Sequence, residues 1–218
     1  ERVILNFPMS MSGNDIGIVH LYYSQNKLFA FVAPDILTGQ PAIFYIATID
    51  PVTYEMTNTG ISVEASLITS VLQIADTLYI SSWDQTLTRT NLTTGLSEEV
   101  VSGTTPLYGS RLAQISTNKI AMLQSEAGYI GGAKPVIVNV ETASVTIADD
   151  PTVYALVSVF GASVYDAATS TYLNLVGSFE TDSYLDILKV NTTTGTQTTT
   201  RVNTTSLSRN VLIIDIER

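Results

Sequence analysis

Apolar and polar residues alternate along most of this chain, and short polar turns interrupt the alternation at close intervals. A period of two is the pattern of a β-strand with one buried face, whereas apolar spacings of three and four residues would indicate a helix. β-branched and aromatic residues, which favour strands, fill most of these segments. The pattern therefore predicts an all-β protein with many short antiparallel strands.

The alternation recurs in units of four strands. The turn after the first strand of each unit is polar and lies near Asn26, Asp76, Asn118 and Ser170, so these turns are 50, 42 and 52 residues apart. A four-stranded propeller blade takes about 40 to 50 residues. The four units cover approximately residues 16–60, 67–103, 110–150 and 162–203. In the first unit, the predicted strands are Ile18–Ser24, Leu28–Ala33, Ala42–Ile49 and Tyr54–Thr57.

Stacked blades bury a continuous core that one blade cannot bury alone. The repeat therefore predicts a single β-propeller domain over residues 1–218. Strand-like segments also occur outside the four units, at Val3–Phe7, Thr205–Arg209 and Val211–Glu217. They predict a composite fifth blade from residues 1–7 and 205–218, closed by the N-terminal strand. The alternative is an open arc that another chain or further sequence continues.

The third strand of the units leads into a turn with a recurring sequence, seen at Ala47–Thr53 and at Leu188–Gly195. This arrangement of a strand, an Asp or Asn, and then Thr or Thr-Gly resembles the generic repeats of YVTN-like and quinoprotein-like β-propellers. The third unit, with Glu141-Thr142-Ala143 at its turn, lacks the Asn or Asp and the Gly. The resemblance implies a fold of about five four-stranded blades and no particular activity.

Composition excludes several classes of partner. The net charge is −10, and the ten Lys and Arg residues are scattered rather than clustered, so we expect no nucleic-acid partner. No apolar run approaches the roughly 18 to 20 residues that span a bilayer, so we expect no membrane insertion. The absence of cysteine excludes disulfides and Cys-based zinc sites. The chain begins at Glu1 rather than Met, and a cleaved secretory signal is one explanation.

No catalytic set emerges from the sequence. His20 is the only histidine, and it lies in an alternating strand. A nucleophilic serine on a sharp turn would appear as Gly-x-Ser-x-Gly, which does not occur. We therefore predict that the protein is not an enzyme and requires no cofactor.

One acid follows the second strand of every unit. If these loops lie on one face of a propeller, the four carboxylates ring the mouth of the central channel. Such a ring could bind Ca²⁺ through oxygen ligands, or two of its members could form the acid and base pair of a glycosidase. The chain has no Asp-x-Asp-x-Asp-Gly calcium loop, and acids commonly occupy exposed loops. The candidates are Asp35, Asp84, Glu126 and Glu180.

Two aromatic residues in the same loops suggest a carbohydrate site. Trp83 directly precedes Asp84, and Tyr129 lies in the glycine-rich loop Gly128–Gly132. An aromatic platform beside hydrogen-bonding groups suits a sugar, although Trp83 could equally pack between blades.

Three sequons for N-glycosylation occur, at Asn91, Asn191 and Asn203. Chance alone gives about as many in this composition, so their placement is the better argument. Asn91 and Asn191 occupy equivalent turns of two units, where a glycan would be exposed.

We therefore predict a non-catalytic, glycosylated domain that is secreted or on the cell surface and binds protein or carbohydrate. The first alternative is a structural subunit of an extracellular filament or surface assembly, built by self-association through open β-edges. The second alternative is a glycoside hydrolase that uses the loop carboxylates.

Overall fold

The computed structural model describes residues 10–11, 14–15, 17–24, 27–33, 42–65, 68–82, 86–102, 105–125, 132–147, 152–155, 163–177 and 185–202. These residues form strands and turns, with no helix among them. In these ranges, therefore, no helix is long and apolar enough to cross a membrane.

Four antiparallel sheets of four strands make up the body of the fold. We call them blades 1 to 4 in chain order. Blade 1 consists of β3 (Gly17–Ser24), β4 (Lys27–Ala33), β5 (Ala42–Ile49) and β6 (Met56–Ala65). Blade 2 consists of β7 (Ile68–Ile74), β8 (Thr77–Ser82), β9 (Leu87–Asn91) and β10 (Ser97–Glu99).

Blade 3 consists of β13 (Gly109–Gln114), β14 (Lys119–Ser125), β15 (Gly132–Asn139) and β16 (Ser144–Ile147). Blade 4 consists of β18 (Ser163–Asp166), β19 (Thr171–Gly177), β20 (Leu185–Asn191) and β21 (Gln197–Val202). The short strand β17 (Tyr154–Ala155) bridges β15 and β19 and so joins blades 3 and 4 into one sheet. The described residues also form two small hairpins: β1 (Ser10–Met11) with β2 (Asn14–Asp15), and β11 (Val101–Ser102) with β12 (Thr105–Pro106).

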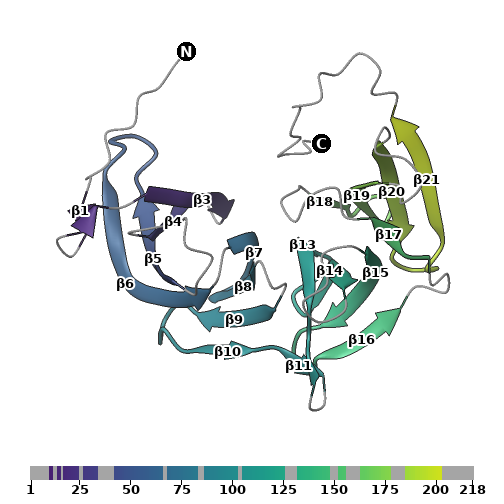
Figure 1. Cartoon of the computed structure of the whole chain (residues 1–218), viewed down its shortest axis with the longest axis horizontal. Coiled ribbons are helices and arrows are strands. Elements are labelled where there is room, and N and C mark those ends of the chain that lie inside the picture. The colour runs from purple at the N-terminus through teal and green to yellow at the C-terminus, as the bar shows by residue number, and fades with distance from the viewer. Residues whose placement is uncertain are drawn as a thin grey trace.

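The blades follow one another around an arc, with blade 1 and blade 4 at its two ends (Figure 1). The first strand of each blade faces the inside of the arc, and the fourth strand lies at the outside (Figure 1). This is the blade arrangement of a β-propeller, so the predicted fold class is confirmed. The fifth blade was predicted from residues 1–7 and 205–218, which lie outside the described residues, and it stays a prediction. So does the single domain over residues 1–218.

The hydrophobic core lies between the blades, because each strand alternates its side chains between two neighbours. Between blades 1 and 2, Phe31 and Phe44 pack with Ile68 and Ile80 in one buried cluster. A second cluster joins blades 2 and 3, and a third joins blades 3 and 4. The repeat in the sequence is thus a repeat of interfaces, each built from facing apolar sides of consecutive blades.

The fourth strand of blade 1 differs from the prediction. We expected it at Tyr54–Thr57, whereas β6 begins at Met56 and continues to Ala65. A register shift between Ile46 and Ala47 lets the strand pass the polar residues that looked like its end. Gly60 takes a φ of 79°, and its N–H donates to the Asn58 side chain at 2.8 Å. A bulge at this point therefore keeps the strand paired.

Candidate functional site

The turn between the third and fourth strands has the same geometry in all four blades. An Asp or Asn closes the third strand, and its Oδ1 accepts hydrogen bonds from the backbone N–H groups two and three positions later. The donor–acceptor distances run from 2.7 to 3.2 Å. This is the Asx turn that short polar side chains form with their own backbone. The four residues are Asp50, Asn91, Asn139 and Asn191.

The prediction that the third unit lacks this residue is wrong. Asn139 occupies this position, two residues before Glu141. The residue four positions after the Asx residue has a positive φ in every blade, yet only two of these residues are glycines. They are Tyr54, Gly95, Ala143 and Gly195.

In blades 2, 3 and 4, the Asx turn is also tied to the first hairpin of its own blade. The residue after the Asx residue donates its N–H to a carbonyl of that hairpin: Leu92 to Asp76 at 2.7 Å, and Thr192 to Ser170 at 2.8 Å. Val140 repeats this contact in blade 3. Both turns of a blade therefore lie at the same end of its strands, and they form one face of the molecule, which we call the turn face.

In blade 1, the carboxylate of Asp50 makes these bonds. The backbone N–H groups of Thr53 and Val52 hold the pKa of Asp50 below its usual value. Asp50 thus stays ionised, since the charged form is the better acceptor.

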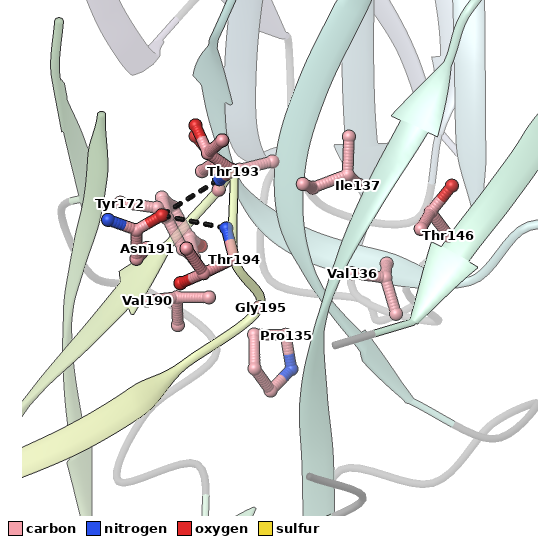
Figure 2. Close-up of a pocket in the computed structure, with 12 residues that line it drawn as sticks. Pro135, Val136, Ile137, Thr146, Tyr172, Val190, Asn191, Thr193, Thr194 and Gly195 are labelled. Carbon is pink, nitrogen blue, oxygen red and sulfur yellow. Dashed lines mark hydrogen bonds between the residues drawn. The ribbon is translucent and has the colours of Figure 1, made fainter. Parts of the chain in front are cut away.

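A pocket opens on the turn face between blades 3 and 4, with a volume of about 190 Å³. One wall is the Asn191 turn and the end of β20. The opposite wall is formed by β15 and β16, which contribute Pro135, Val136, Ile137 and Thr146 (Figure 2). Figure 2 also shows Oδ1 of Asn191 bonded to the N–H groups of Thr193 and Thr194, which fixes the shape of this wall.

A buried polar network braces the two blades around this pocket. The Tyr172 hydroxyl donates to the carbonyl oxygen of Arg111 at 2.7 Å, and Asn174 Nδ2 donates to the Tyr172 hydroxyl at 2.7 Å. The Arg111 guanidinium in turn donates to Asn174 Oδ1 and to the carbonyl of Leu175. Burial raises the pKa of Tyr172, so it remains a neutral phenol. Burial lowers the pKa of Arg111.

Most of the predicted site residues fall outside the described part of the chain. This holds for the four carboxylates Asp35, Asp84, Glu126 and Glu180, for the aromatic residues Trp83 and Tyr129, and for the sequon residue Asn203. Their roles stay predictions. Within the described ranges, no group of three or more His, Asp or Glu side chains could hold a metal ion. His20 lies in β3, where it pairs with Phe31.

The structure does place Asn91 and Asn191 in equivalent turns, each partly exposed. It also adds residues that we had not selected, above all Ala121 and Thr192 in the pocket and Arg111 with Asn174 in the network. Comparing the four units position by position could have found them. Asn174 aligns with Ala30, Ile80 and Met122 and is the one polar residue among these four.

No family model and no curated protein matches the chain. Solved structures do. A GH74 xyloglucanase from Xanthomonas campestris is 10% identical with a TM-score of 0.50, covering 77% of this chain and 29% of the xyloglucanase. A putative 6-phosphogluconolactonase from Bacteroides fragilis is 10% identical with a TM-score of 0.50, covering 87% of this chain and 55% of the other.

The N-terminal domain of Nup159 is 10% identical with a TM-score of 0.44, covering 85% of this chain and 47% of that domain. This chain thus spans about half or less of each of these three neighbours. At such low identity, the likeness to the xyloglucanase and the lactonase shows the fold alone. The chain has a β-propeller fold.

Proposed function

We propose that this chain is a non-catalytic binding or scaffold domain of the cell surface or the extracellular space, with a protein or a carbohydrate as its partner. The observation that carries this proposal is the pocket between blades 3 and 4. Apolar side chains, threonine hydroxyls, one amide and backbone groups line it. Tyr172 is the single titratable residue of this lining. It stays neutral, and its hydroxyl donates a hydrogen bond to the backbone carbonyl of Arg111. Such a lining suits reversible recognition of a neutral group.

The Asx turns support an extracellular location. In Asn91 and Asn191, the turn holds the side-chain oxygen, whereas an N-linked glycan is attached to the nitrogen Nδ2. Each is followed at the second position by a threonine, Thr93 or Thr193, which completes the sequon. Asn139 sits in the same turn of blade 3 but has Glu141 at that position. The chain therefore offers its own matched control.

We expect the chain, secreted from eukaryotic cells, to carry glycan on Asn91 or Asn191, because both turns are partly exposed and equivalent. Peptide mass spectrometry measures the occupancy. Replacing the sequon threonine, as in Thr93→Val and Thr193→Val, should remove each glycan. Glu141→Thr should add one to Asn139. Unmodified peptides at all three asparagines would contradict the proposal that the turn face is glycosylated.

A structural subunit is the second candidate, favoured by exposed apolar side chains on the face of blade 1 that points away from blade 2. Leu21, Tyr23 and Ile43 are 45%, 65% and 51% exposed there, beside the buried Ala30 and Val32 of the same face. Between consecutive blades, such apolar side chains are buried in the shared core clusters. Light scattering on the same secreted sample separates the two candidates, since a monomer supports the binding domain and a homopolymer supports the structural subunit. The glycoside hydrolase alternative depends on carboxylates outside the described residues and stays a prediction.

A further inference from the structure

The pocket lies at the interface where one blade lacks an aromatic side chain that the two preceding blades have at the equivalent position. One position of the second strand pairs, in each blade, with the residue two places before the Asx residue. Phe29 occupies it in blade 1, Tyr79 in blade 2 and Ala121 in blade 3. Phe29 is buried between blades 1 and 2, and Tyr79 between blades 2 and 3. Between blades 3 and 4, the equivalent position carries only the methyl group of Ala121.

A second position changes in the same way. The residue after the Asx residue is Leu92 in blade 2 and Val140 in blade 3, and both pack on the core of the preceding interface. In blade 4 it is Thr192, whose hydroxyl turns away to donate to the Ser170 carbonyl at 3.0 Å. At the interface between blades 3 and 4, both walls therefore carry a smaller side chain than the equivalent walls of the other two interfaces: Ala121 on blade 3 and Thr192 on blade 4.

Tyr172 recovers part of the missing volume, because its buried ring stands where Leu78 and Ile120 stand in the earlier blades. The remaining space is the pocket of about 190 Å³. An apolar cavity of about 150 Å³ is large enough to bind benzene. The pocket thus has room for one six-membered ring, and the other two interfaces fill the corresponding space with a ring of this chain's own.

We propose that the pocket between blades 3 and 4 binds a neutral monocyclic aromatic ring of about phenol size. This rests on the proposed function and names its ligand chemistry. Ala121, Ile137 and Val190 contact the ring, as apolar groups contact Phe29 and Tyr79 elsewhere. The rim threonines Thr146 and Thr194 offer hydroxyls for a polar substituent. A charged ring is excluded, because the lining has no countercharge.

The test is a methyl NMR titration of the full chain, labelled at alanine, isoleucine and valine, with p-cresol as the probe. We expect saturable shifts at Ala121, Ile137 and Val190, and none with benzoate. Ala121→Phe and, separately, Thr192→Leu restore the side chains of the other interfaces. Each should raise the dissociation constant about tenfold or more, the effect of losing about 1.4 kcal/mol. N-acetyltyrosinamide is the second probe in the same titration, because its binding would show that the pocket also accepts the tyrosine ring of a partner protein.

Tyr79→Ala is the matched gain variant, because it opens the corresponding space between blades 2 and 3. It should create a second set of shifts at Val138 and Val140. Absence of saturable p-cresol shifts in the native chain would overturn the inference. So would unchanged binding in folded Ala121→Phe and Thr192→Leu. If p-cresol fails while another neutral compound binds this pocket, the inference fails and the proposed function stands.

Discussion

Replacing Tyr172 by alanine is expected to lower the free energy of unfolding by about 3–5 kcal/mol, the usual cost of removing a large buried aromatic side chain. The residue is 1% exposed and belongs to the core between blades 3 and 4. Its loss also leaves two buried groups without their present partner: the carbonyl oxygen of Arg111 and Nδ2 of Asn174. Urea denaturation followed by circular dichroism measures the change.

Tyr172→Phe separates the two contributions, because it keeps the ring and removes only the hydroxyl. The expected loss is about 1–3 kcal/mol, the cost of leaving buried polar groups unsatisfied. If the alanine and phenylalanine variants lose the same amount, the ring contributes nothing and the packing account of this interface is wrong.

Phe31→Ala is expected to have an effect of similar size at the other end of the arc, about 3–5 kcal/mol. Phe31 is fully buried, and its cluster includes residues of both blade 1 and blade 2. Removing the ring leaves a cavity between two blades, and the rigid sheets on either side limit its collapse. The measurement is again equilibrium unfolding in urea.

Val52→Ala serves as the control for Phe31→Ala. Val52 is 81% exposed in the turn of blade 1, so its truncation should change stability by no more than about 0.5 kcal/mol. A loss at Phe31 as small as at Val52 would show that blades 1 and 2 do not share a core.

The sequence predicted the strands well because their alternation is a local property. In β5, for example, the predicted Ala42–Ile49 is the observed range. The Asx turns of blades 2 and 4 were also visible, because Asn91 and Asn191 stand before a glycine at the position of positive φ. In blade 3, the predicted turn begins at Glu141, two residues after the Asx residue Asn139, so the sequence pattern placed this asparagine in the preceding strand.

The pocket could not be predicted, because it depends on which side chains meet across an interface. Ala121 and Thr192 lie far apart in the sequence, and neither is unusual where it stands. The register of β14, compared with that of β4 and β8, shows that Ala121 stands where the other blades have Phe29 and Tyr79. Arg111 and Asn174 were missed for the same reason, since a polar residue inside an alternating strand looks like a solvent-facing one.

We propose above all that this propeller binds a neutral partner and does not catalyse a reaction on it. An NMR screen of the full chain tests this most directly. Methyl signals of Ala121, Ile137 and Val190 report on the pocket. Neutral sugars, neutral aromatic compounds and their charged analogues are added in turn, together with a panel of glycosides. The account predicts that neutral compounds shift these signals, that charged analogues do not, and that no product forms. Hydrolysis of a glycoside, or a pocket that no neutral compound occupies, would contradict it.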